Sequence, residues 1–376
     1  MSYILEVPPR IVSGWGSVST IGTEVAALGR HAMLVYSERL EHSELLRQMI
    51  GYMENQGVRV FRSEVPTGEP TIDRVETILR AMEINKVEVV VGIGGGSILD
   101  TAKAAAGLCF SGRKEVKEYF YGLKPDNVGI PWVAVPTTSG TGAEATPNSV
   151  LSDEKKLKQS IRGDASWLPH AILLDPMLTV SCTPKVTAWS GMDALTQAIE
   201  AHTSKGANVL TEPYSLKASQ LIVCSLKQAY ENPKNQKART DMAYGSLLAG
   251  IALANARLGI VHGIAHSIGL HYNVPHGLVC GTLLPWAIKY NNSVSAHKYG
   301  ELAKSTGIGS KAEDLIEWVV HLNKILRIPP SLKEFGLDKK DFPRIVEESM
   351  PSGSLKANPR HTTEIDLIDF LQEQLI

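Results

Sequence analysis

Residues 88–103, with the sequence EVVVGIGGGSILDTAK, decide how the first half of this chain folds. The apolar run predicts a buried strand, the three consecutive glycines predict a tight turn, and the residues that follow predict a helix. Glycines remove the side chains that would block a phosphate, and the free N–H groups and dipole of a helix start stabilise an anion. The stretch therefore predicts a pyrophosphate cradle formed by Gly94, Gly95, Gly96 and Ser97.

Two standard phosphate-binding patterns are incomplete here. The dinucleotide fingerprint G-x-G-x-x-G that starts at Gly92 needs a glycine at its sixth position, where this chain has Ser97. The Walker pattern fails as well, because no Gly-Lys-Ser/Thr follows the glycines. A tight strand-to-helix turn without a ligand is therefore the alternative interpretation.

Short apolar strands alternate with amphipathic helical stretches on both sides of this motif, which is typical of a parallel sheet covered by helices. We predict strands at 32–36, 58–61, 88–93, 132–135 and 171–174, and helices at 41–54, 72–85 and 98–109. The N-terminal half is therefore expected to be an α/β domain with a Rossmann-like parallel sheet.

The pattern changes after Asp175-Pro176, where apolar residues recur at helical spacing with little strand-like alternation. Helices are predicted at 186–201, 214–230, 238–256, 293–303, 312–326 and 365–375. Thr183-Pro184 is a natural helix start, because proline suits the first helical turn. We therefore expect two domains, an α/β domain at 1–178 and an all-α domain at 179–376.

Charge and length limit the classes of function. The chain has 376 residues, and 38 Lys+Arg against 39 Asp+Glu leave a net charge of −1. Because nucleic acid binding draws its affinity from an excess of basic residues, the balanced charge argues against nucleic acid as the main partner. A small local phosphate site is compatible with this balance.

No targeting or membrane segment is expected. The first ten residues lack the basic start, long apolar core and cleavage site of a secretory signal. The uncharged stretch 242–256 is shorter than the ~20 residues that span a bilayer, so we expect a buried helix there. The four cysteines lie dozens of residues apart with no C-x-x-C pair among them, which predicts reduced thiols in a cytoplasmic protein and no cysteine zinc site.

A second predicted strand end, at 131–144, reads PWVAVPTTSGTGAE and is rich in hydroxyl groups and glycine. Thr137, Thr138, Ser139 and Thr141 are placed to donate to phosphate, ribose or amide groups at the carboxyl edge of the sheet, where open α/β sheets bind ligands. By itself this loop is weak evidence for a site.

The helical half contains a third group of residues. Asp193 and Gln197 are four residues apart, and so are His262 and His266, which puts each pair on one face of a helix. His276 follows shortly after. Histidine and carboxylate side chains that converge from different helices are how a helical domain builds a metal site, whereas a single histidine is more often structural. The clustering of histidines favours a metal site.

Four motifs together resemble those of the iron-containing (group III) alcohol dehydrogenases, in order and at the expected separations: GGGSILDTAK, PTTSGTGAEAT, GMDALTQAIEA and HGIAHSIGLHYNVPHG. The resemblance extends from a P-x-I-V-S-G-x-G segment at 9–16 to an NPR sequence at 358–360. It implies an N-terminal domain that binds NAD or NADP, a C-terminal helical domain with one divalent metal, and a substrate cleft between them. It also implies a homodimer or larger homo-oligomer.

The resemblance also implies roles for individual residues. The pyrophosphate loop and the helix start behind it correspond to Gly95, Gly96, Ser97 and Asp100. The contacts on the nicotinamide side correspond to Thr137, Thr138 and Thr141, and a lysine that contacts the cofactor corresponds to Lys158. The metal ligands are an aspartate, a histidine four residues later and two further histidines. They correspond to Asp193, Gln197, His262 and His276, so this chain departs from the family at Gln197.

An amide oxygen at position 197 is a neutral and poorer donor than imidazole, so metal affinity should fall. Asp193, His262 and His276 still provide three ligands, which is the number common in catalytic zinc sites. The related glycerol dehydrogenases and dehydroquinate synthases resemble this three-ligand arrangement, whereas the maleylacetate reductases resemble a metal-free version. We expect one divalent metal, Fe²⁺ or Zn²⁺.

The reaction implied is hydride transfer between the carbinol carbon of a small alcohol and C4 of the nicotinamide, with the metal polarising the oxygen. Asp193, His262 and His276 take part as metal ligands. His266, one helical turn from His262, is expected to relay the proton or else to orient a ligand, and His271 is a weaker candidate for the same role. The substrates are small alcohols or aldehydes, which no motif specifies further.

The position that selects between the two cofactors is the end of the first strand, where an acidic residue would bind the ribose 2′-OH and repel a 2′-phosphate. Ser37 stands at this position, with Arg39 close by and Glu38 adjacent. The absence of the carboxylate at this position favours acceptance of NADP.

Three rival interpretations remain. A metal-free reductase of an unsaturated oxo acid, similar to maleylacetate reductase, would explain Gln197. A lyase related to dehydroquinate synthase would use the same cofactor loop, although the helical motif here is of the alcohol dehydrogenase type. A non-catalytic nucleotide-binding protein with a structural metal would bind the cofactor without turnover.

Overall fold

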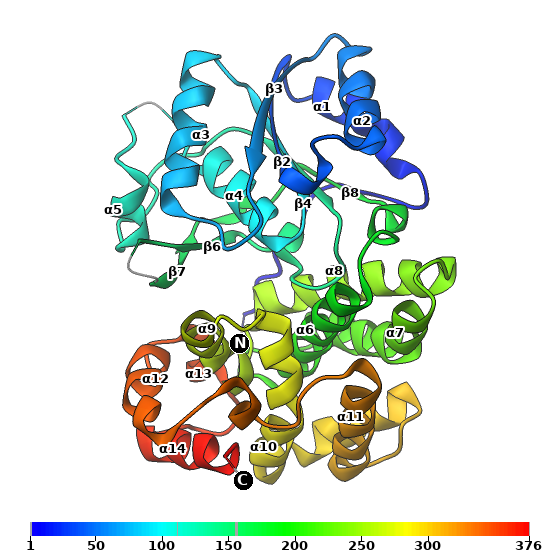
Figure 1. Cartoon of the computed structure of the whole chain (residues 1–376), viewed down its shortest axis with the longest axis vertical. Coiled ribbons are helices and arrows are strands. Elements are labelled where there is room, and N and C mark those ends of the chain that lie inside the picture. The colour runs from blue at the N-terminus through cyan, green and yellow to red at the C-terminus, as the bar shows by residue number, and fades with distance from the viewer. Residues whose placement is uncertain (1, 111, 155–156, 376) are drawn as a thin grey trace. The chain divides into compact units, whose positions relative to one another are not determined.

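The apolar run of the glycine motif forms β4 (Val89–Gly94), which lies inside a six-stranded parallel sheet (Figure 1). The strand order is β1-β8-β5-β4-β2-β3, with the bounds Ile11–Ser13, Ala171–Leu174, Trp132–Pro136, Val89–Gly94, His31–Ser37 and Arg59–Val65. All of these strand pairs are parallel. The predicted parallel sheet is thus confirmed, and β1 is an edge strand that the sequence pattern did not reveal.

The structure is a computed structural model that describes residues 2–110, 112–154 and 157–375. Its contacts divide the chain into two units. The α/β unit consists of Glu6–Thr138 and Ala143–Thr179, and the helical unit consists of Met1–Leu5, Ser139–Gly142 and Val180–Ile376. The main division therefore follows Thr179, and a short piece of the hydroxyl-rich loop belongs to the helical unit.

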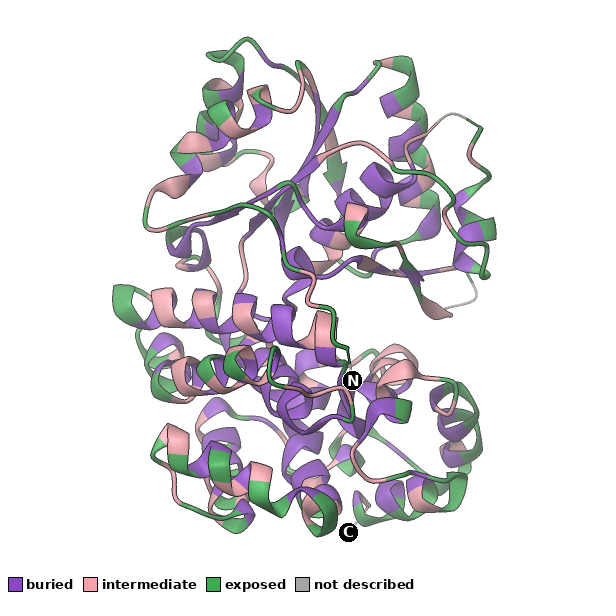
Figure 2. Ribbon diagram, turned by 180° about the vertical axis from the view of Figure 1, so that it is seen from behind, coloured by how far each residue is buried: buried purple, intermediate pink, exposed green. Residues whose placement is uncertain are grey.

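Helices cover both faces of the sheet because its strands are apolar on both sides. On one face, Leu34 and Val91 pack against Leu46 of α2 (Glu44–Glu54), beside α1 (Ile21–Ala26). Successive side chains of a strand point to opposite faces. Gly92 accordingly lies against α4 (Gly96–Gly107), where an added Cβ would be 2.7 Å from the Cβ of Ala102. The central strands are buried, as their purple colour in Figure 2 shows.

The rest of the α/β unit surrounds this core. Helix α3 (Ile72–Ile84) packs beside α4, and α5 (Val116–Phe120) follows. An antiparallel hairpin of β6 (Asn148–Ser152) and β7 (Lys158–Arg162) packs against α4. Most residues of the two strands are polar, with the sequences NSVLS and KQSIR, so the hairpin lacks the apolar run by which the sheet strands are recognised.

The helical unit contains nine α-helices within the described residues and no strand among them. Their bounds are α6 Pro184–Thr203, α7 Glu212–Glu231, α8 Gln236–Ala256, α9 Ile260–Tyr272, α10 His276–Thr306, α11 Ala312–Leu326, α12 Phe342–Ser349, α13 Gly353–Ala357 and α14 Glu364–Glu373. Helix α6 starts where the sequence predicts, since Thr183 accepts a hydrogen bond from the Val186 N–H (3.3 Å) and Pro184 occupies the first turn.

Two findings in this unit bear on the predictions. Helix α10 begins at His276, far ahead of the predicted start at residue 293. The uncharged stretch 242–256 lies in α8, most of which is buried. Among the described residues no single helix is long and apolar enough to cross a bilayer; α8 and α9 reach that length and composition only together, and the chain bends by 106° between them.

Candidate active site

One face of α6 carries three polar side chains into the core of the helical unit. Asp193, Gln197 and Glu200 follow one another at helical spacing, and each is at least 95% buried. Burying polar groups in this way is costly unless they find partners. The hydrogen-bond partners of these three side chains determine how the site is arranged.

Glu200 holds the start of α9 in place. Its carboxylate accepts hydrogen bonds from the backbone N–H groups of Val261 (2.7 Å) and His262 (3.3 Å), which are orphan donors of the first helical turn. The side chain of Asn358 accepts from the N–H of Ile260 (3.1 Å). At Gly259, which precedes the helix, an added Cβ would lie 2.8 Å from Glu200 Oε1, so the close approach requires glycine.

The same carboxylate orients the ring of His262. Nδ1 of His262 lies 2.7 Å from Glu200 Oε2 and donates to it, which leaves Nε2 as the nitrogen that faces the cluster. Nε2 lies 3.2 Å from Asp193 Oδ1. A histidine whose second nitrogen is held by a carboxylate is a common arrangement in metal sites.

Helix α10 delivers the remaining donors. His276 is its first residue, and Cys280 follows one turn later on the same face. The helix can approach α6 because Gly277 has no side chain: an added Cβ would lie 2.0 Å from the carbonyl oxygen of Trp189 and 3.2 Å from the Cβ of Asp193. This contact brings His276 Nε2 to 3.7 Å from Asp193 Oδ1.

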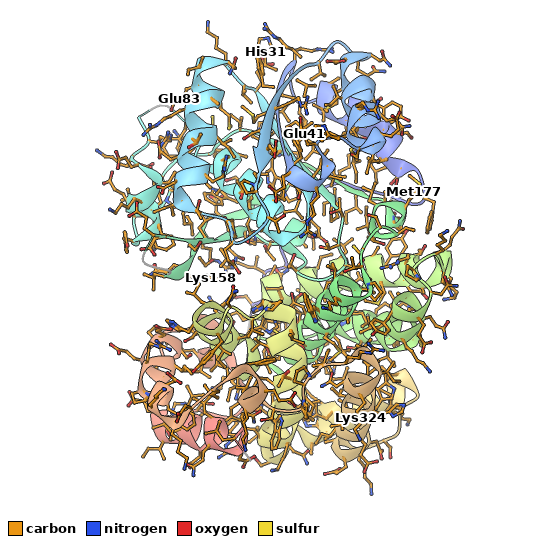
Figure 3. All side chains as sticks on the ribbon, in the orientation of Figure 1. His31, Glu41, Glu83, Lys158, Met177 and Lys324 are labelled. Carbon is orange, nitrogen blue, oxygen red and sulfur yellow. The ribbon has the colours of Figure 1, made fainter. Side chains whose placement is uncertain are left out.

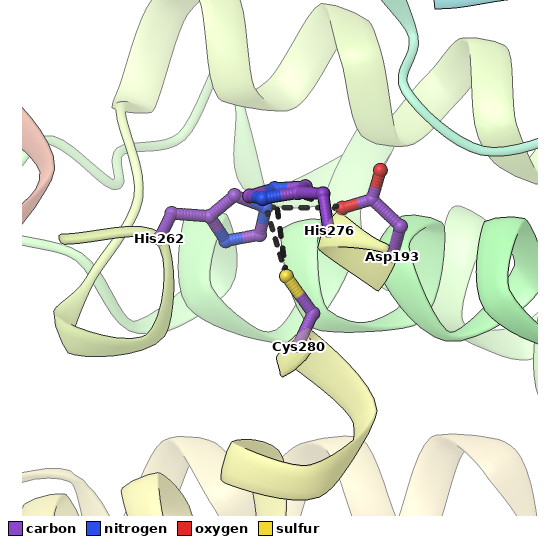
Figure 4. A group of neighbouring side chains, drawn as sticks. All are labelled: Asp193, His262, His276 and Cys280. Atoms are coloured by element: carbon purple, nitrogen blue, oxygen red, sulfur yellow. Dashed lines mark hydrogen bonds and ion pairs between the residues drawn. The ribbon is translucent and has the colours of Figure 1, made fainter. Parts of the chain in front are cut away.

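Asp193, His262, His276 and Cys280 form one cluster, shown in Figure 4. Each residue offers one ligand atom, and these atoms all lie within 4.8 Å of one another. Cys280 Sγ is 3.5 Å from His276 Nε2 and 4.0 Å from His262 Nε2. The structure therefore brings together three of the four predicted metal ligands, with a thiol as an additional member.

The electrostatics of the cluster favour a positive charge. Burial disfavours the imidazolium of His262, but its interactions with Cys280, Asp193 and Glu200 outweigh burial and hold the pKa of His262 well above its usual value. Burial raises the pKa of the Cys280 thiol to about 12, against the opposing influence of His262. The donor set of carboxylate, imidazole and thiol suits a divalent metal of borderline softness.

The fourth predicted ligand, Gln197, lies one turn after Asp193. Its Nε2 donates to the carbonyl oxygen of Thr141 at 3.3 Å, a residue that the sequence places among the nicotinamide contacts. Its Oε1 is buried and has no hydrogen-bond partner among the described residues. The amide thus has one oxygen available as a donor to a cation.

His266 and His271 are placed differently. The ring of His266 stacks on that of His276, with centroids 4.7 Å apart and planes inclined by 14°. His271 instead approaches Glu348 of α12, with Nε2 2.8 Å from Oε1. His266 therefore adjoins the cluster, whereas the described contacts of His271 are with a carboxylate of another helix.

The two loops predicted to contact the cofactor lie side by side at the ends of β4 and β5. Gly94 pairs with Pro136 in the sheet, and the N–H of Thr137 donates to the carbonyl oxygen of Gly94 (3.0 Å). Gly95 precedes α4, and an added Cβ there would lie 3.2 Å from Thr138 Oγ1. Gly96 and Ser97 are the first residues of α4. Glycine at position 95 thus allows the close approach of Thr138, and the N–H groups at the start of α4 are donors of the kind that bind a pyrophosphate.

Asp100 and Lys158 engage other residues of the α/β unit. The Asp100 carboxylate accepts from the Val150 N–H (3.1 Å) and from Lys103 Nζ (3.2 Å), and burial raises the pKa of this carboxyl. Lys158, labelled in Figure 3, lies on β7 with its Nζ 2.7 Å from Glu69 Oε2. Asp100 therefore ties α4 to the β6–β7 hairpin, and its predicted contact with the cofactor stays a prediction.

Ser37 is the last residue of β2 and precedes a short turn of 3-10 helix, Glu38–Leu40. Glu38 accepts a hydrogen bond from the Thr67 N–H (2.8 Å), and the hydrogen bonding to Thr67 lowers the pKa of this carboxyl. The carboxylate of Glu38, the residue next to Ser37, is thus already hydrogen-bonded to a backbone N–H group.

Sequence reasoning missed Cys280, Glu200 and Lys103. The expectation of no cysteine zinc site considered only cysteine pairs, and it overlooked a single cysteine that joins histidines. The spacing of four residues from His276 to Cys280 was the available signal, since the same spacing drew attention to the other pairs. Lys103 is fully buried and donates to the carbonyl oxygen of Asn148 (2.6 Å), a role no pattern indicates.

Known proteins share this architecture. A model of iron-containing alcohol dehydrogenase matches residues 8–176, and a model of the C-terminal part of the Fe-containing alcohol dehydrogenase family matches residues 187–375. The chain is 32% identical to lactaldehyde reductase of Escherichia coli K12, with 95% of both chains covered. It is 33% identical to 1,3-propanediol dehydrogenase of Klebsiella pneumoniae, with 96% of both covered.

A solved structure agrees with these matches. The crystal structure of a 1,3-propanediol oxidoreductase superimposes with a TM-score of 0.94 at 31% identity and covers 100% of both chains. The predicted fold, enzyme class and cofactor types are confirmed by this set of relatives. The described residues include a group that could hold the divalent metal of the iron-containing alcohol dehydrogenases. The chain therefore belongs to the iron-containing alcohol dehydrogenase family and is an NAD(P)-dependent oxidoreductase that acts on alcohols and aldehydes.

Proposed function

We propose that this enzyme interconverts small alcohols and aldehydes at a divalent metal centre held by Asp193, His262 and His276. The observation that supports this assignment is the convergence of the three ligand atoms from α6, α9 and α10 within a buried cluster. Gln197 Oε1 and Cys280 Sγ are the candidates for a fourth ligand.

A metal bound by these side chains supplies Lewis-acid polarisation of a carbonyl or alcohol oxygen. The protein itself holds the ligand side chains in positions from which they can bind the metal. Glu200 keeps His262 in the tautomer whose Nε2 is free to coordinate, and Gly277 lets His276 reach the carboxylate of Asp193.

His266 is our candidate for moving the proton. It lies one turn from His262 on α9 and its ring stacks on that of His276, so it adjoins the ligands without belonging to the four-residue cluster. Histidine suits proton transfer near neutral pH. The alternative role is to fix the plane of the His276 ring.

The cofactor is assigned to the carboxyl ends of β4 and β5. Its pyrophosphate would lie against Gly94, Gly95, Gly96 and Ser97, with Thr137, Thr138, Thr141 and Lys158 as further contacts and Asp100 supporting the start of α4. Ser37 at the end of β2 brings no negative charge, and Glu38 is held by Thr67, so we propose that NADP is accepted along with NAD.

Small alcohols, diols and hydroxyaldehydes are the proposed substrates, because the relatives are named for lactaldehyde and 1,3-propanediol. We place the enzyme in the cytoplasm, since all four cysteines are free thiols. We also propose a homodimer or larger homo-oligomer. Support comes from β1, an edge strand whose neighbourhood exposes Val7, Ile11 and Trp15.

A substrate panel tests this function. Protein loaded anaerobically with Fe²⁺ or Zn²⁺ is expected to oxidise propanol and propanediols and to reduce lactaldehyde with both NAD(H) and NADP(H), and a chelator is expected to stop turnover. The readout is nicotinamide absorbance together with bound metal. Turnover that survives complete metal removal would support the metal-free reductase, and cofactor binding without any turnover would support the non-catalytic alternative.

Glu200→Gln is expected to weaken zinc binding about 10- to 100-fold, because the amide no longer provides the charged acceptor that orients His262. The same change should lower the melting temperature, since Glu200 also accepts from the first N–H groups of α9. Chelator competition measures the first effect and calorimetry the second.

Glu212→Gln is the matched control, because Glu212 pairs with Lys298 and makes no described contact with the cluster. Zinc affinity equal to the wild type in Glu200→Gln would show that His262 needs no such partner.

A further inference from the structure

Cys280 is the one member of the metal cluster that the expected ligand set does not contain. It lies one turn after His276 on α10, is 0% exposed, and belongs to a different helix from Asp193 and His262. Its sulfur faces the coordinating nitrogens of both histidines, as Figure 4 shows.

Four of the distances within the cluster are close to those around a tetrahedral cation, and no pair of its ligand atoms is more than 4.8 Å apart. Bond lengths of about 2.3 Å to sulfur and about 2.0–2.1 Å to nitrogen or oxygen separate sulfur from nitrogen by about 3.6 Å and nitrogen from oxygen by about 3.4 Å. The corresponding separations are 3.5 and 4.0 Å from Cys280 Sγ to the two histidines. From Asp193 Oδ1 to the same nitrogens they are 3.2 and 3.7 Å.

We propose that the thiolate of Cys280 is the fourth ligand of the metal, in place of Gln197, and that the resulting Asp-His-His-Cys site selects Zn²⁺ over Fe²⁺. This inference rests on the proposed metal centre. The number of protein ligands stays at four, while one neutral oxygen donor is exchanged for a charged sulfur donor; the substrate oxygen would then be a fifth ligand, which catalytic zinc can accept.

The charge of the site favours this exchange. The four ligand residues include two buried groups that can carry a negative charge, Asp193 and Cys280, which equal the charge of a dication; the buried carboxylate of Glu200 pairs with His262 Nδ1 and is not a ligand. Gln197 is neutral, and its Nε2 already donates to Thr141. Cysteine binds metals as the thiolate, so coordination forms the sulfur–metal bond, breaks the S–H bond and releases its proton to solvent.

The identity of the donor atom determines which metal is preferred. Thiolate ligands favour zinc over harder cations, whereas a carboxylate, two imidazoles and an amide discriminate less. A single sulfur is therefore enough to shift the preference between the two metals that the sequence leaves open.

Cobalt substitution tests the sulfur ligand directly, because a thiolate bound to Co²⁺ gives a charge-transfer absorption band in the near ultraviolet. We expect this band in Co²⁺-loaded wild-type protein and in the control Cys224→Ser, which alters an exposed cysteine. We expect no band in Cys280→Ser or Cys280→Asp. Cys280→Asp keeps an anionic ligand and should still bind zinc, so loss of the band there cannot be attributed to loss of the fold.

Metal affinity gives the second measurement. The preference for Zn²⁺ over Fe²⁺ in anaerobic competition is expected to fall roughly tenfold or more in Cys280→Ser and to stay unchanged in Cys224→Ser. A wild-type protein without the cobalt band, or an undiminished preference in Cys280→Ser combined with weaker binding in Gln197→Ala, would overturn the proposal in favour of the amide. Neither spectrum nor affinity depends on turnover, so failure of the proposed alcohol dehydrogenase activity would be seen separately.

Discussion

Asp193→Asn is expected to release the metal and to lower kcat/KM for alcohol oxidation by about 10³-fold or more. The carboxylate lies 3.2 Å from His262 Nε2 and 3.7 Å from His276 Nε2, so it joins the two imidazoles in one site. Asparagine has the same shape but no charge, and a buried dication then loses an anionic ligand. Metal catalysis contributes several kcal/mol, which corresponds to a rate factor of this size.

The measurement is bound metal by elemental analysis together with steady-state rates. Asp241→Asn is the matched control, because Asp241 lies on α8 and pairs with Lys237 and Ser225 rather than with the cluster. Retained activity in Asp193→Asn without bound metal would refute the metal centre and would favour the metal-free reductase that Gln197 first suggested.

Gly277→Ala is expected to destabilise the helical unit by about 1–3 kcal/mol and to weaken zinc binding by at least about tenfold. An added Cβ would lie 2.0 Å from the carbonyl oxygen of Trp189, a distance at which α10 must move away from α6. Because His276 and Cys280 are carried by α10, any such movement separates them from Asp193. Stability and metal affinity should therefore fall together.

Calorimetry without added metal and zinc competition separate the two effects. Gly51→Ala is the control: Gly51 lies within α2 with nothing within 4 Å of an added Cβ, and alanine there should be neutral or stabilising by up to about 1 kcal/mol. An unchanged melting temperature and zinc affinity in Gly277→Ala would show that the two helices need no close approach.

Local patterns predict the α/β unit well. The strand at β4 and the helix at α4 follow from one apolar run and three glycines, and the structure shifts their predicted bounds by only one or two residues. Parallel strands buried on both faces are continuous apolar runs, which is the pattern most easily recognised in a sequence. The β6–β7 hairpin lacks such a run, and so it was missed.

Helix α10 shows where periodicity fails. Its first turns, from Gly277 to Ile288, are mostly buried, so apolar residues occur on all sides and no amphipathic period marks the helix. The predicted helix therefore begins only at residue 293, where one face becomes exposed. Because the start of α10 was not predicted, the position of Cys280 on the same helix face as His276 was not predicted either.

Only part of the candidate site could be predicted from the sequence. Spacing identifies pairs within one helix, such as Asp193 with Gln197, but it carries no information on which pairs meet across helices. Glu200 is the clearest case, since it is on α6 while its partners are on α9. Asp100 shows the converse: it belongs to a recognised motif, yet its carboxylate faces the β6–β7 hairpin. Side-chain direction depends on packing, which spacing alone does not specify.

The ligand residues are spread along the chain: His262 comes 69 positions after Asp193, and Cys280 comes 18 positions after His262. A cation shared by them ties together three helices that the backbone leaves separate, so its binding energy adds to the free energy of unfolding by mass action. Cells starved of zinc should therefore contain less of this enzyme, because newly made chains without bound zinc unfold more often and are degraded by proteases.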